Sequence, residues 1–188
     1  MSVYPPIGRM EGFMELQAIT PRSTFRVSFH DCDAFGHLNN ARYISHFIDA
    51  RTDHLRDFHG YDVYADAEKT GKNWVVQNTS IRYLYPAKLN QLVEIETRLL
   101  RFEKHRLFPE GIMRDPETGK VHAIVWFDLA YVDLKTGRPA RHGGALTELV
   151  SRIVETDPDM ERFDFAKRVA QIMSIHGRRE TSREAEVA

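Results

Sequence analysis

The stretch HDCDAFGHLNN, residues 30–40, separates two different hydrophobic patterns and decides the fold. Before it, apolar and polar residues alternate over about residues 24–30, which predicts a β-strand. After it, apolar residues recur every three or four positions, which predicts a helix from about Asn40 to His59. Asn39 is the expected cap, and Gly60 lies where a helix commonly ends. A strand, a short polar loop and a helix therefore follow one another here.

Asp33 lies seven residues before Asn40, the first residue of the predicted helix. The first backbone N–H groups of a helix lack internal partners and lie at the positive end of the helix dipole, so they bind anions or a developing oxyanion. A carboxylate that faces such donors provides a base or nucleophile together with an oxyanion-binding group, the minimum needed to hydrolyse an acyl compound. The alternative is that Asp33 and Asn39 are only turn and cap residues, and the local sequence leaves both interpretations open.

The segments DCDAFGHLNNARY, residues 31–43, and IDART, residues 48–52, together resemble the signature of the hot-dog thioesterases. The likeness covers about residues 24–140 and is greatest to the branch with the 4-hydroxybenzoyl-CoA thioesterases and the plant acyl-ACP thioesterases. It implies an α+β hot-dog fold, with an antiparallel five-stranded sheet wrapped around one long helix. It also implies an acyl-CoA thioesterase. The alternatives are an acyl-ACP thioesterase and a hot-dog module that binds an acyl thioester or a protein without hydrolysis.

The resemblance gives two residues the central catalytic roles. In the family, the carboxylate at the position of Asp33 attacks the thioester or activates water. The helix-start N–H at the position of Asn40 polarises the thioester carbonyl. Some hot-dog thioesterases place their carboxylate within the long helix instead, which makes Asp49 an alternative base.

Three further residues of the motif are candidates. His37 and Asn39 match the histidine and the first asparagine of the plant-type pattern, so His37 is a catalytic candidate and Asn39 a substrate-binding candidate. Tyr43 is a second substrate-binding candidate from the same segment. The chain departs from the plant enzymes at Phe35, where they carry a catalytic asparagine, and from another bacterial subgroup at Asn40, where that subgroup carries a histidine.

Basic residues gather in RFEKHR, residues 101–106, between two predicted strands. Such a cluster alone is most often a solvated hairpin tip. In thioesterases that resemble this chain, basic residues at this strand junction contact the CoA phosphates. The resemblance carries that substrate-binding role to Lys104 and His105.

The composition restricts the other possibilities. With 188 residues the chain fits one domain, and its net charge of −1 gives no general attraction to nucleic acid or an anionic membrane. No apolar run reaches the ~20 residues of a membrane span, so we expect a cytoplasmic protein. Nine scattered histidines show no metal-ligand spacing, and no cofactor or metal is expected. Cys32 is the single cysteine, and its flanking carboxylates disfavour a thiolate nucleophile.

The rest of the chain divides into short alternating segments and a helical end. Strands are predicted at about residues 74–85, 92–102, 106–114 and 121–134, with an interruption at Pro109 and a polar connection over 62–73. Helices are predicted at about 145–155 and from Asp157-Pro158 to Gly177. The expected units are an N-terminal arm (1–22), the hot-dog domain (23–142), a C-terminal helical extension (143–177) and a charged tail (178–188).

Two expectations concern packing. Positions 44, 48, 51, 55 and 58 share one helix face, and Arg51 is the only charged residue among them. A guanidinium on such a face needs an acceptor, so we expect Arg51 to pair with a carboxylate or with backbone carbonyls. The predicted sheet would also leave open strand edges, so we expect a homo-oligomer, either a homodimer or a homotetramer built as a dimer of dimers.

Overall fold

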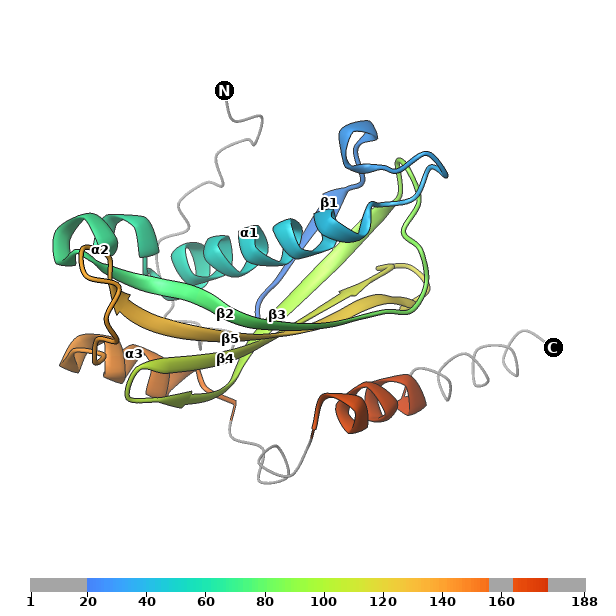
Figure 1. Ribbon diagram of the computed structural model, residues 1–188. Helices are drawn as coiled ribbons and strands as arrows, with labels where there is room; N and C mark the ends of the chain where they lie inside the picture. The colour runs from blue at the N-terminus through green and yellow to red at the C-terminus, as the bar shows by residue number, and fades with distance from the viewer. Residues whose placement is uncertain (1–19, 156–163, 176–188) are drawn as a thin grey trace, which may run out of the picture.

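The computed structural model describes residues 20–155 and 164–175. The elements follow in the order β1 (Arg22–Arg26), η1 (Phe29–Asp31), α1 (Asn40–His59), α2 (Val63–Thr70), β2 (Lys72–Tyr83), β3 (Leu92–Glu103), β4 (Arg106–Arg114), β5 (Val121–Asp133) and α3 (Gly144–Ile153), and a last helical segment covers 165–175. The five strands form one antiparallel sheet in the order β1-β3-β4-β5-β2, and α1 lies across one face of it (Figure 1). The expected α+β hot-dog architecture with extra C-terminal helices is confirmed.

Helix α1 begins and ends where the sequence predicts. The Asn39 side chain accepts a hydrogen bond from the Ala41 N–H, and Gly60 ends the helix in the left-handed conformation at φ 66°. A residue with a Cβ is strained at that φ, so the glycine makes the helix end here. None of the described helices is long and apolar enough to cross a membrane.

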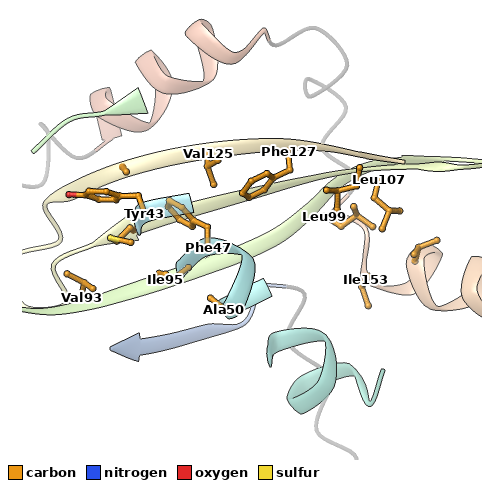
Figure 2. Close-up of a cluster of buried hydrophobic side chains, with 14 of the residues drawn as sticks. Tyr43, Phe47, Ala50, Val93, Ile95, Leu99, Leu107, Val125, Phe127 and Ile153 are labelled. Atoms are coloured by element: carbon orange, nitrogen blue, oxygen red, sulfur yellow. The ribbon is translucent and has the colours of Figure 1, made fainter. Parts of the chain in front are cut away.

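The buried face of α1 differs from the predicted one. Tyr43, Phe47, Ala50 and His54 are buried, and the aromatic rings among them lie against strands β3 and β5 (Figure 2). Phe58, expected in the core, is 39% exposed. The prediction was wrong because it counted large apolar side chains only, whereas the face is completed by a small residue and by a histidine whose two ring nitrogens both have partners.

Gly111 of β4 lets α1 approach the sheet closely. A Cβ at this position would lie 2.5 Å from Cδ1 of Phe47 and 3.0 Å from Cγ1 of Val125. The Phe47 ring therefore fills the space that any other residue at position 111 would need. Helix α1 and the sheet can lie this close because Gly111 has no side chain.

The opposite face of the sheet is covered by the segment 165–175, which lies on the other side from α1 (Figure 1). Val169 and Ile172 pack there against Ile124 and its neighbours. Glu110 of β4 is 1% exposed on this face, and its carboxylate is bound by three groups from different elements. They are the guanidinium of Arg98, the guanidinium of Arg168 and the indole N–H of Trp126.

Two predicted boundaries need correction, and a third lies outside the described residues. The first strand ends at Arg26 instead of continuing to about residue 30, because residues 29–31 form the turn η1. The predicted connection 62–73 contains α2, whose N-terminus is capped by Asp62 through the N–H groups of Tyr64 and Ala65. The predicted helix start at Asp157-Pro158 lies outside the described residues, and the described helix follows Asp164, which accepts a hydrogen bond from the Lys167 N–H.

The predicted interruption at Pro109 is confirmed. Neither Phe108 nor Pro109 has a paired residue on β5, although the pairs on both sides keep one register. On the other side of β4, the register with β3 shifts between Leu99 and Arg101. A proline has no N–H to donate, so the ladder is broken where it lies.

Candidate active site

Residues 31–39 form a small loop that closes on itself before α1. The Asp33 N–H donates to the His37 carbonyl at 2.8 Å, and the Asn39 N–H donates to the Asp31 carbonyl at 2.8 Å. Gly36 makes the turn at φ 72°, a conformation that favours glycine. The loop therefore holds Asp33 beside the residues that lead into the helix.

The Asp33 carboxylate is fixed through one oxygen only. Its Oδ1 accepts hydrogen bonds from the N–H groups of Phe35 at 2.9 Å and His37 at 3.2 Å. Its Oδ2 accepts none from any described residue, and the side chain is half-buried. One oxygen thus orients the group, while the other keeps its lone pairs for a proton or an electrophile.

One donor at the start of α1 is also unused. Asn39 satisfies two of the first N–H groups, because its Oδ1 accepts from Ala41 at 3.0 Å and its carbonyl accepts from Arg42 at 2.8 Å. The N–H of Asn40 has no acceptor within the described part of the chain. The hydroxyl of Tyr83 donates to the Asn40 carbonyl at 2.9 Å and so fixes the next peptide, between Asn40 and Ala41, from β2. The helix start presents a free, positively polarised N–H.

Asp31, two residues before Asp33, is in a different situation. Its carboxylate accepts from the Ser28 hydroxyl at 2.7 Å and lies 3.4 Å from both Arg42 Nε and His46 Nε2. Burial alone would raise the pKa of Asp31, but the Ser28 hydrogen bond and the charges of His46 and Arg42 hold it below its usual value. Asp31 therefore ties the loop to α1 and has no free oxygen comparable to that of Asp33.

The other motif residues serve the loop or the core. His37 interacts with Asp33 through its backbone, and its half-buried ring makes no hydrogen bond to a described residue. Tyr43 is only 2% exposed, and its hydroxyl accepts from the Ala87 N–H at 3.0 Å, so it holds a neighbouring segment and has no surface for a substrate. Burial and the charges of Asp31 and Asp33 raise the pKa of the Cys32 thiol, which agrees with its expected structural role.

Lys104 and His105 lie far from this loop. They form the exposed turn between β3 and β4. Strand β3 pairs with β1 near the loop at Leu92 and then runs eleven residues to Glu103, a distance of about 36 Å. A single chain therefore does not bring these two residues together with Asp33. Within the chain, the long strand separates the two predicted parts of the site.

The sequence did not identify the segment 84–91, which supports the loop from the side. Its Ala87 carbonyl accepts from the Leu38 N–H at 2.8 Å, and its Leu89 N–H donates to the Gly36 carbonyl at 2.9 Å. These hydrogen bonds use backbone groups, so the residue types in the segment do not predict them. Next to this support, Phe29 and Phe35 are 76% and 83% exposed and give the loop an apolar surface.

Comparison with known proteins shows the family of the chain. A family model described as the thioesterase-like superfamily matches residues 27–162. The chain is 29% identical over 135 residues, 71% of its length, to the long-chain acyl-CoA thioesterase FadM of Escherichia coli K12, of which it covers 99%. It is 34% identical over 74 residues, 39% of its length, to the acyl-CoA thioester hydrolase YbgC of Escherichia coli O6:H1, of which it covers 54%.

A solved structure shows the same arrangement. The probable thioesterase YbaW from Escherichia coli superimposes with a TM-score of 0.61 at 26% identity, covering 71% of this chain and 98% of that one.

Proposed function

Because the chain belongs to the thioesterase-like superfamily, we propose that it is an acyl-CoA thioester hydrolase whose reaction takes place between Asp33 and the start of α1. The proposal rests on two groups that make no hydrogen bond to a described residue, Oδ2 of Asp33 and the N–H of Asn40. One belongs to the closed loop and the other to the residue directly after it. The names of the relatives FadM and YbgC support an acyl-CoA substrate.

In this reaction the Asn40 N–H donates a hydrogen bond to the thioester carbonyl oxygen. The negative charge that develops on this oxygen is stabilised by the N–H and by the positive end of the α1 dipole. Asp33 Oδ2 either takes a proton from the attacking water or attacks the carbonyl carbon to form a mixed anhydride that water then cleaves. In both routes a C–O bond replaces the C–S bond, and the thiolate of CoA leaves and takes up a proton.

The surroundings supply binding for the rest of the substrate. Phe29 and Phe35 offer exposed aromatic surface beside Asp33, which suits an apolar acyl group. We propose that Lys104 and His105 contact the CoA phosphates from a neighbouring subunit, since the single chain places them at the other end of β3. His37 and Asn39 then act by shaping the loop, through their backbone groups and, for Asn39, through the cap.

The direct test is the release of free thiol from a panel of acyl-CoA and acyl-ACP substrates by the wild-type protein and by Asp33→Asn. The asparagine keeps an oxygen for the N–H groups of Phe35 and His37 but removes the charge and basicity, so the fold is retained. Turnover is expected to fall by at least ~100-fold. Faster hydrolysis of acyl-ACP than of acyl-CoA would identify the other carrier.

Two matched variants control for loss of charge near the helix. Asp31→Asn weakens contacts to Arg42 and His46 but leaves Asp33 in place, so it is expected to reduce turnover by much less. Asp49→Asn changes an exposed carboxylate on α1 and tests the alternative base. If Asp33→Asn keeps near-normal turnover while Asp49→Asn loses it, the assignment of Asp33 is wrong. If no substrate of the panel is hydrolysed, the chain is a non-hydrolytic binding module.

A further inference from the structure

A cavity lies toward the opposite end of α1 from the active-site loop. It is enclosed by the second half of α1, the far ends of the strands and α3, and it contains about 580 Å³ of empty space including its mouth. The cavity itself has a volume of about 50 Å³, where one water needs roughly 10 to 15 Å³. Arg51 on its wall lies eleven residues after Asn40, about 16 Å along the helix axis, so the cavity is separate from the loop.

Most of the cavity wall is aliphatic. The side chains come from three strands and from α3, which closes the space below α1, and they are Leu99, Leu107, Leu129, Leu149, Val150 and Ile153. A wall of this kind binds an apolar group and does not favour a hydrated ion.

Two polar residues of the wall already have their partners. His54 Nδ1 lies 2.7 Å from Thr97 Oγ1 and its Nε2 lies 3.0 Å from Ser23 Oγ, so both ring nitrogens are used. Arg98 is paired with the buried carboxylate of Glu110. These residues need nothing further from a ligand.

Arg51 and His59 have no such partners among the described residues. Nε of Arg51 and Nδ1 of His59 are buried and make no hydrogen bond, and the Arg51 guanidinium pairs with no carboxylate of the described residues. His59 is only 8% exposed. Burial lowers the pKa of Arg51 to about 10, so the side chain still carries its charge at neutral pH. The acceptor that the sequence led us to expect for Arg51 is therefore missing from the described chain.

We propose that this cavity binds a carboxylate attached to an apolar chain, with the carboxylate on Arg51 and the chain against the aliphatic wall. The single guanidinium in apolar surroundings favours a ligand with one negative charge on an otherwise apolar molecule. A guanidinium binds a carboxylate through two parallel hydrogen bonds. Such a ligand is either a free acid or the far end of an acyl group that carries a second carboxylate.

Binding is measured by isothermal titration calorimetry with octanoate and, as the uncharged match, octan-1-ol. Trp74 also lines the cavity, so its fluorescence gives a second signal. Octanoate is expected to bind the wild-type protein at least tenfold more tightly than octan-1-ol. Equal binding of the two, or no binding of octanoate, would overturn the proposal.

Two variants separate the charge from the apolar wall. Arg51→Met removes the guanidinium and keeps an unbranched apolar side chain, so it is expected to weaken octanoate binding at least tenfold and leave octan-1-ol unchanged. Arg56→Met is the control, because Arg56 lies on the same helix but pairs with Asp53 and Asp57 at the surface. The proposal also requires Arg51→Met to fold with a urea midpoint no lower than that of the wild type. A lower midpoint, or failure to fold, would show that Arg51 already has an acceptor in the protein and would overturn it.

The source of the carboxylate is found by comparing palmitoyl-CoA with the mono-CoA thioester of hexadecanedioic acid, whose acyl chain is long enough to span the ~16 Å between Asn40 and Arg51. If the acyl group supplies the carboxylate, Arg51→Met raises KM for the second substrate only. If a free acid supplies it, both KM values stay unchanged in this variant. The calorimetry needs no hydrolysis, so it tests the cavity even if the proposed thioesterase activity is not found.

Discussion

Asp31 and Asp33 show how the same residue type acquires different roles two positions apart. Asp31 accepts from a serine hydroxyl and faces two basic side chains, so its charge is used to hold the loop on α1. Asp33 accepts only backbone N–H groups, and only on one oxygen. The difference comes from the turn η1 and the closed loop after it, which direct the two carboxylates to different neighbours.

His54 is expected to make the stability depend on pH. Burial lowers its pKa to about 4, so the folded protein keeps it neutral. As the pH falls below the unfolded value of about 6.5, the unfolded chain binds a proton that the folded chain does not. The free energy of unfolding should therefore decrease by about 2 kcal/mol between pH 7 and pH 5, and continue to decrease until the pH reaches about 4.

This contribution is isolated by urea denaturation of His54→Gln at both pH values. The glutamine can still bond Thr97 and Ser23 but does not titrate, so the variant should lose about 2 kcal/mol of the pH dependence. His105→Gln, at an exposed histidine, is the control for the exchange of a histidine for a glutamine. An identical pH dependence in wild type and His54→Gln would show that His54 is not held neutral by the fold.

At the scale of elements, the contact between α1 and β4 depends on Gly111. Gly111→Ala places a methyl group where the Phe47 ring lies, so the ring must move or the helix must shift away. Overpacking of this kind costs about 1 to 3 kcal/mol. Gly144→Ala is the matched control, since a Cβ at the start of α3 meets no atom within 4 Å. Urea midpoints of the two variants should differ clearly, with only Gly111→Ala destabilised.

The same helix shows which features the sequence determines. Its ends could be predicted because Asn39 and Gly60 act through their own backbone and nearest neighbours. Its buried face could not, because the position of Ala50 and His54 in the core depends on what the sheet presents to them. Local spacing left the role of Asp33 and Asn40 open, and the family resemblance assigned it. The support from the segment 84–91 and the distance to Lys104 depend on how β2 pairs with β5 and β3 with β1.

At the scale of the whole molecule, β2 is an open edge of the sheet. Among the described strands it pairs with β5 alone, and its Val75 and Val76 are 39% and 45% exposed. Since an open edge with apolar side chains favours pairing with another copy, we expect a dimer at micromolar concentration in light scattering. Val76→Lys should shift the mass toward the monomer.

Leu134→Lys is the control for this experiment, because Leu134 is also exposed but follows β5, on the side of β2 that is already paired. It should leave the mass unchanged. A wild-type protein that is monomeric at these concentrations would contradict the prediction, and it would leave Lys104 and His105 without a neighbouring subunit through which to reach the substrate.

The two arginine partners of the Glu110 carboxylate are made at different times during synthesis of the chain. One of its two arginine partners, Arg98, belongs to β3 and is synthesised before it, while the other, Arg168, comes 58 residues later. While the ribosome is still making the chain between β5 and residue 168, this buried acid has only one of its two guanidinium partners. The last described helix therefore acts as a delayed closing step in biosynthesis, and a nascent chain released before residue 168 would leave the outer face of its sheet open to chaperones and to other chains.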